Sequence, residues 1–408
     1  MLTSQNLKDK IIIYSFSIYI FFWSYNILEL KFLRYFIIIP IIISLVEYKN
    51  LIKIDLKKFS LIPILLLIHY FLVNLNNNEQ ILFRDLIGII FLTLIMLTFL
   101  TYREKIKKNF TNILKFYFYF LIFFSVLYEK KIYVGSCVSF FFDYIPLLNN
   151  LSLSSAFFSE NSHLAMMNVG AILSAFYLCF DKKNNQLLFL TTFALLINLL
   201  NLSTTFLMGY IMCSIIFLFL TKNNIFKLFL LISSIILLSM QLFNEDCNKK
   251  FVGINIDEIK DEKLQRGNGG LTSKIYERSI IISLKTLKNK PLGWGYDGTI
   301  KATKNYENSR KQKNLHMDLL IWKFNYRDAL GNLFKIIIEF GLVSLALLPL
   351  IIKFFKRQNI NEFEIFILSI FFVQLFRGAG YINGGFIIAL TEIFLARYFL
   401  ARHDFKKN

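Results

Sequence analysis

The chain has 408 residues, of which 56% are hydrophobic and 18% charged, and its formal net charge is +19. That hydrophobic fraction exceeds what a soluble globular protein carries. Apolar runs of about 17–25 residues recur, which is the length that crosses a bilayer as a helix. Because lipid cannot satisfy exposed backbone polar groups, these runs must be helical. The composition therefore excludes a soluble protein and predicts an all-α, polytopic transmembrane helical bundle.

The excess of basic residues does not predict a nucleic-acid partner. Lysine and arginine gather in short connections between apolar runs, where they set topology and contact the lipid bilayer. The four cysteines, at 137, 179, 213 and 247, have neither CxxC nor another metal-ligand spacing. We therefore expect neither a metal site nor a cofactor.

Taken in chain order, about twelve segments are predicted to span the membrane. They lie at 11–28, 32–47, 59–75, 81–100, 110–128, 162–180, 186–201, 205–221, 225–243, 330–352, 362–377 and 383–400. They divide the chain into spans one to nine in 1–243, a large polar loop in 244–329, and spans ten to twelve with a tail in 330–408.

Basic residues follow the even-numbered spans, as Lys105, Lys182 and Lys353 illustrate. Cytoplasmic connections carry such an excess of lysine and arginine, whereas long loops cross the membrane regardless of charge. Both termini are therefore predicted to be cytoplasmic and the large loop external.

The first group with possible chemistry is the run FSENSHLA, which leads into the sixth span. Glu160 and His163 are three residues apart and share one helix face. A glutamate that complements the helix dipole is the plainer interpretation of Glu160. That interpretation does not account for His163, so both are candidate acid–base residues.

The large loop supplies the second group. Apolar spacing predicts an amphipathic helix over 273–289, which ends before Pro291. The run PLGWG then forms a turn in which Gly293 and Gly295 let the backbone approach a ligand or the bundle closely. Arg278 lies on the helix, and its spacing alone favours a solvated charge over a functional one.

Three further residues fall on or near the predicted outer face. His316 stands two residues before a carboxylate and can serve as a general base, although a structural histidine explains it equally. Arg84 adjoins Asp85 and can simply pair with it. Arg377 precedes a GAGY run and can extend toward lipid head groups. Because all of these candidate residues fall on the same predicted side of the membrane, we expect a single outward-facing site.

The order of these motifs resembles a known family. FSENSHLA is similar to the Glu-x-Ser-x-x-Ala signature of oligosaccharide repeat-unit polymerases, and Arg278 followed by PLGWG resembles their Arg…Pro-x-Gly-x-Gly run. The segment from Asn332 to Glu339 and the following Gly-Leu resemble their Asn…Glu-x-Gly-Leu entry into a helix. This combination is typical of the Wzy-type O-antigen polymerase and O-antigen ligase superfamily. Ligases and many of their relatives carry a histidine where this chain has Gly331.

The resemblance implies a GT-C-like glycosyltransferase that works without metal and inverts the anomeric centre. Its donor and acceptor would be undecaprenyl-pyrophosphate-linked glycans at the periplasmic face, and a chain-length regulator would be a possible partner. It implies a base among Glu160, His163 and His316. For the pyrophosphate it implies, besides catalytic Arg278, the residues Arg84, Gly293, Gly295 and Arg377.

Three other functions stay open. An O-antigen ligase would transfer glycan to lipid A core, and the missing histidine favours polymerase over ligase. A flippase or transporter of lipid-linked sugars would show inverted repeats and ionisable residues at mid-membrane, whereas here the charges lie toward the outside. The third alternative is a non-catalytic scaffold for polysaccharide assembly.

Overall fold

The computed structural model describes residues 4–22, 33–47, 54–77, 80, 82–127, 161–200, 203–242, 271–312, 329, 331–355, 360–378 and 380–396. Within these ranges the chain is helical and forms no strand. The helices of the apolar bundle are α1 (Ser4–Phe21), η1 (Leu33–Ile37), α2 (Ile38–Val46), α4 (Leu56–Phe59), α5 (Leu61–Asn76), α6 (Phe83–Lys108), α7 (Phe110–Leu127), α10 (Asn161–Lys182), α11 (Asn185–Leu200), α12 (Thr204–Leu220), α13 (Asn224–Leu242), α20 (Leu347–Phe355), α21 (Glu362–Phe376), η3 (Asn383–Gly385), α22 (Phe386–Leu390) and η4 (Thr391–Leu395). The remaining helices are α16 (Leu271–Asn289), α17 (Thr299–Gln312), α19 (Asn332–Phe340) and η2 (Gly341–Ala346).

A helix or a run of consecutive helices lies at each predicted span. Of the described helices, four are long and apolar enough to cross a bilayer, namely Leu56–Asn76, Phe83–Lys108, Ser162–Lys182 and Asn332–Pro349. The other apolar helices among them are shorter, and the number twelve stays a prediction. The prediction of an all-helical protein is confirmed, and some of its helices are long and apolar enough to cross a membrane.

The outer surface of the bundle is apolar. On α5, Leu65 and Leu75 are 63% and 68% exposed, and on α13, Ile225 is 63% exposed. Contiguous apolar surface of this kind is unfavourable in water and marks an interaction surface. These faces are the ones expected of helices that contact lipid.

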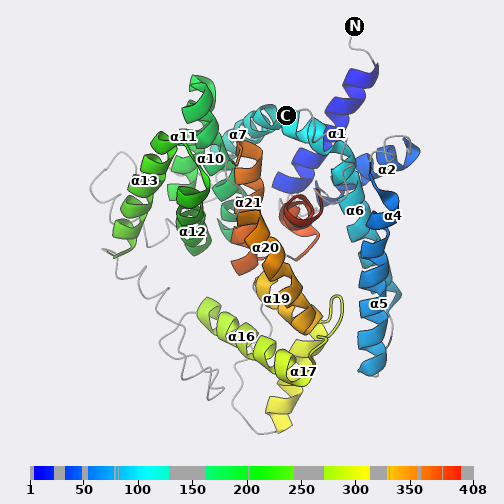
Figure 1. Ribbon diagram of the computed structural model, residues 1–408. Helices are drawn as coiled ribbons and strands as arrows, with labels where there is room; N and C mark the ends of the chain where they lie inside the picture. Colours follow the sequence, from blue (N-terminus) through cyan, green and yellow to red (C-terminus); the bar gives the residue numbers. More distant parts are fainter. Residues whose placement is uncertain are drawn as a thin grey trace.

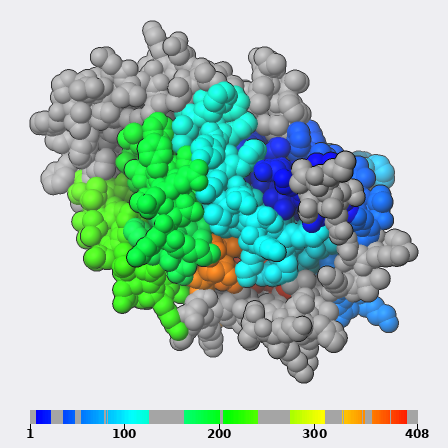
Figure 2. Space-filling model, turned by 90° about the horizontal axis from the view of Figure 1, so that it is seen from above, coloured from blue at the N-terminus to red at the C-terminus, as the bar shows by residue number. Residues whose placement is uncertain are grey.

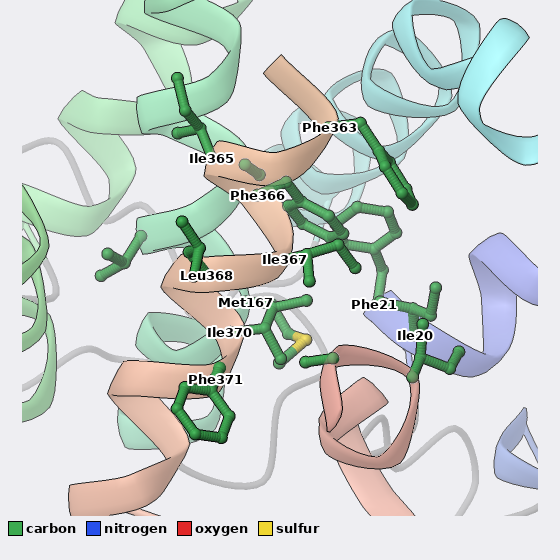
Figure 3. Packing of buried hydrophobic residues seen from close by; sticks show 14 of the residues in the cluster. Ile20, Phe21, Met167, Phe363, Ile365, Phe366, Ile367, Leu368, Ile370 and Phe371 are labelled. Carbon is green, nitrogen blue, oxygen red and sulfur yellow. The ribbon is translucent and has the colours of Figure 1, made fainter. Parts of the chain in front are cut away.

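Helix α21 forms the centre of the bundle. Its residues from Ile365 to Phe371 are buried on every side, which is typical of a helix surrounded by others. Figure 3 shows Phe366 beside Phe21 of α1, with ring centroids 5.2 Å apart. Helix α10 comes so close that a Cβ on Gly170 would lie 3.1 Å from the Phe366 carbonyl oxygen.

The bundle has two chemically different ends. At one end, the ion pairs Lys105–Asp9 (2.6 Å), Lys182–Glu362 (3.2 Å) and Arg103–Glu392 (2.6 Å) join the helices. Figure 2 shows this end, formed by α1, α7 and α11–α13 with α21 between them. Helices α16 and α17 lie at the other end (Figure 1), where the Tyr276 hydroxyl donates to the Phe376 carbonyl oxygen at the end of α21.

The polar end has a small core of its own. It comprises Ile281, Ile282, Trp294, Ala302, Tyr306, Ala329 and Ile338, with Phe334 packed against them. These residues come from α16, α17, α19 and the segments between them. The predicted amphipathic helix over 273–289 is confirmed as α16. Helix α19, which begins the predicted tenth span, packs against this core.

The PLGWG turn binds to the end of α19 through the backbone. Trp294 and Gly295 donate N–H groups to the carbonyl oxygens of Ile338 (3.0 Å) and Glu339 (2.9 Å), and Leu342 donates back to Pro291 (2.7 Å). Gly293 and Gly341 have φ angles of 80° and 54° and face each other. The close approach of backbones expected from the glycines is thus made to the protein itself.

Substitution of the two turn glycines separates crowding from backbone strain. Both Gly293 and Gly295 have a φ near 80°, so alanine at either costs about 1–2 kcal/mol in strain. A Cβ on Gly293 would also lie 2.4 Å from the Glu339 carbonyl oxygen, whereas one on Gly295 finds its nearest neighbour at 3.5 Å. We expect Gly293→Ala to lower the melting temperature of the detergent-solubilised protein more than Gly295→Ala does. Equal losses would contradict the tight contact.

Candidate functional site

A cluster of charged residues lies where the turn, α6 and α19 meet. Asp297 is at its centre: Oδ2 lies 3.1 Å from Arg84 Nη2, and Oδ1 lies 3.6 Å from Lys335 Nζ. Arg84 also lies 3.4 Å from Oδ1 of Asp85. Residues far apart in the sequence, at the start of α6 and in the loop, are therefore joined by one carboxylate.

Lys335 extends this cluster along α19. It is 5% exposed, and its Nζ lies 3.5 Å from Oε1 of Glu339, which is fully buried one helical turn later. The Thr299 hydroxyl donates to the same Oε1 at 2.9 Å. The ring of Tyr381 completes the surroundings, with its centroid 5.4 Å from Lys335 Nζ.

Burial determines the protonation of the nearby phenols. It raises the pKa of Tyr381, and the negative charge of Glu339 raises it further. The pKa of Tyr296 is raised by burial and by Glu339 in the same way. Both hydroxyls therefore keep their protons near neutral pH. Tyr381 is a hydrogen-bond donor at the inner edge of the cluster.

The backbone of Asp297 is left-handed, with φ of 55°. Aspartate and asparagine tolerate this conformation better than other residues with a side chain, although glycine is the usual choice. A strained residue persists where its surroundings hold it. Here Arg84, Lys335 and the backbone contacts of the turn hold Asp297 in this conformation.

A second polar region lies along α16. Arg278 is 1% exposed, and burial lowers its pKa to about 10, so it stays protonated at neutral pH. Lys274 and Glu277 form a buried ion pair at 3.0 Å on the same helix. Burial raises the pKa of Tyr276, while the charge of Arg377 opposes that shift. Helix α16 thus brings Tyr276 to the end of α21, which Arg377 directly follows, and carries Arg278 two residues further along.

Two lysines attach the loop to the end of α5. Lys290 Nζ donates to Asn77 Oδ1 at 2.8 Å and lies 3.7 Å from the centroid of the Trp294 ring. Lys301 Nζ donates to Asn74 Oδ1 at 3.1 Å. These contacts fix the turn over the ends of α5 and α6.

The structure distributes the sequence-predicted site residues unevenly. Arg84 joins the Asp297 cluster, next to the turn that carries Gly293 and Gly295, and Arg278 and Arg377 belong to the α16 region. His163 is half-buried in the first turn of α10. The candidates Glu160 and His316 lie outside the described residues.

The N–H groups of the two turn glycines bind carbonyl oxygens of the protein itself. The N–H group of Gly293 donates to the Lys290 carbonyl oxygen (2.7 Å), and that of Gly295 donates to Glu339 (2.9 Å). Both groups therefore hold the turn in place. A phosphate contact at this turn would have to come from neighbouring side chains.

Sequence reasoning missed Asp297 and Lys335 as site residues and treated Glu339 only as part of a motif. Lys335 and Glu339 are four residues apart at the start of a predicted span, and ionisable residues at membrane depth usually indicate function. That signal was available. Asp297 gives no comparable signal, because a loop carboxylate after a turn is ordinary.

Comparisons of the chain with protein-family models, curated proteins and solved structures give no match.

Lys335→Met should destabilise the protein strongly. Removing one member of a buried ionic group costs about 3–5 kcal/mol, because its partners stay buried without compensation. Arg84→Gln removes the other cation that contacts Asp297, but its side chain is 62% exposed and such pairs contribute about 1 kcal/mol at most. Thermal unfolding in detergent distinguishes the two. Equal effects would show that the buried group does not stabilise the fold.

Proposed function

We propose that this chain is a bacterial inner-membrane polymerase of oligosaccharide repeat units. It joins undecaprenyl-pyrophosphate-linked glycans at the periplasmic face by metal-independent, inverting glycosyl transfer. One observation carries the proposal: buried and half-buried charged groups gather where a polar loop meets one end of an apolar helical bundle. Lipid-linked substrates can reach such a position from the bilayer.

The polar end supplies cations suited to the leaving group. Transfer releases a pyrophosphate whose charge must be stabilised, and arginine forms paired, charge-assisted bonds to phosphate oxygens. Arg278 stays protonated at neutral pH despite its burial. Of the three arginines that the sequence suggests, we assign the donor pyrophosphate to Arg278 and Arg377, because Arg84 already pairs with Asp85 and Asp297.

The two ends of the bundle support the proposed orientation. Basic side chains at the ends of α6 and α10 pair with Asp9 and Glu362 at the end remote from the loop. That end is the cytoplasmic one under the positive-inside rule. The proposed orientation then places both termini in the cytoplasm and the loop in the periplasm.

The surroundings of Gly331 favour a polymerase over a ligase. The resemblance places a histidine at this position in ligases. Here a Cβ on Gly331 would lie 2.7 Å from the carbonyl oxygens of both Leu375 and Phe376. Because backbone atoms occupy that space, no larger side chain fits without displacing α21.

Arg278→Ala should abolish polymer formation while the protein still inserts into the membrane. Loss of a group that meets developing charge costs about 3–4 kcal/mol, or roughly 10²–10³-fold in turnover. Arg278→Lys should restore only part of the rate, since a point charge lacks the paired geometry. Lys288→Ala, which removes an exposed charge from the same helix, is the matched control. Normal polymer length in Arg278→Ala would contradict the assignment to pyrophosphate.

The glycan of a strain that lacks the gene tests the function itself. A missing polymerase leaves surface lipid capped with single repeat units. A missing ligase instead leaves finished polymer on its lipid carrier, and a missing flippase leaves single units in the cytoplasmic leaflet. An unchanged glycan would contradict all three.

A further inference from the structure

The Asp297 cluster has the wrong charge balance for a pyrophosphate. Its carboxylates are Asp85, Asp297 and Glu339, and its cations are Arg84 and Lys335. With the carboxylates in the majority, the cluster repels a second anion and favours a neutral ligand. A sugar hydroxyl, which both donates and accepts hydrogen bonds, has the right chemistry.

Of these three carboxylates, Asp297 is the one that a substrate can reach. Its side chain is 27% exposed, compared with 4% for Asp85 and 0% for Glu339. Arg84 and Lys335 contact its two oxygens separately. The carboxylate is therefore fixed in direction while one side stays accessible.

Glu339 is occupied by contacts within the protein. The Tyr381 hydroxyl donates to its carboxylate, and Oε1 also accepts from the Thr299 hydroxyl at 2.9 Å and lies 3.5 Å from Lys335 Nζ. A bound hydroxyl group would therefore meet Asp297 and not Glu339.

We propose that Asp297 is the catalytic base that activates the acceptor sugar. This inference rests on the proposed polymerase function. The acceptor hydroxyl oxygen forms its bond to the anomeric carbon of the donor while its proton passes to the Asp297 carboxylate. The bond from that carbon to the pyrophosphate oxygen breaks, and undecaprenyl pyrophosphate leaves with the electron pair. Lys335 and Glu339 are positioning residues.

Asp297→Asn isolates the proton transfer. Asparagine has the same shape and accepts the same left-handed backbone, so binding of lipid-linked repeat units should be kept, although the lost charge opposite Lys335 lowers the melting temperature. Turnover is therefore compared at a temperature at which both proteins are folded. Turnover should fall about 10²–10⁴-fold, the usual contribution of a general base. The assay uses the purified full chain and lipid-linked units from the deletion strain. Glu307→Gln, which removes a carboxylate from α17 outside the cluster, should keep wild-type turnover.

Chemical rescue separates a base from a structural residue. Asp297→Gly relieves the backbone strain and opens space beside Lys335, so added formate should restore part of its turnover. Formate should not restore the turnover of Arg278→Ala. Wild-type turnover in Asp297→Asn, or failure of formate to rescue Asp297→Gly, overturns the proposal. Loss of turnover in His163→Ala alone would instead move the base to α10.

The same assay separates the two levels of the argument. If the wild-type chain forms no polymer from lipid-linked units, the proposed polymerase function fails. If it forms polymer and Asp297→Asn does so equally well, the function stands and the assignment of the base fails.

Discussion

The polar end of the molecule depends on a single buried ammonium group. Lys335 lies between Asp297 of the loop and Glu339 of its own helix, at 3.6 and 3.5 Å. Burying a lysine is costly unless carboxylates compensate it, and the fully buried Glu339 is costly without the lysine. Lys335 can therefore stay buried and charged only while both carboxylates stay beside it. The backbone contact between the turn and the end of α19 holds the partners within reach.

Two regions of different charge share α19. Helix α16 packs on α19 and carries Arg278, whereas the turn after α16 carries Asp297 to the other part of α19. In the reaction that we propose, the anionic leaving group and the neutral acceptor need opposite surroundings. A cationic region beside a carboxylate-rich one would meet both needs, and one short helix fixes their relative positions.

The sequence predicts the helices far better than the site. Apolar period and length were sufficient for the helical class and for α16, and the glycines were sufficient for the turn at Gly293, because these features are local. The ion pair of Arg84 with Asp297 joins residues 213 positions apart, and no periodicity indicates which loop residue meets which helix end. Asp297 was missed for a second reason. Its backbone is left-handed, and in a sequence this conformation is normally predicted from a glycine. Glu160 and His316 lie outside the described residues, so their roles stay predictions.

The departure at Gly331 and the place of Asp297 have a common physical explanation. A side chain at 331 is excluded by the carbonyl oxygens of Leu375 and Phe376, so α19 meets α21 through backbone. A base at position 331 has no room. One turn further along α19, Lys335 instead contacts a carboxylate that the loop supplies. Under the proposed mechanism the proton acceptor therefore comes from the turn and not from the helix, and the backbone contact between Gly293 and Gly341 holds it there.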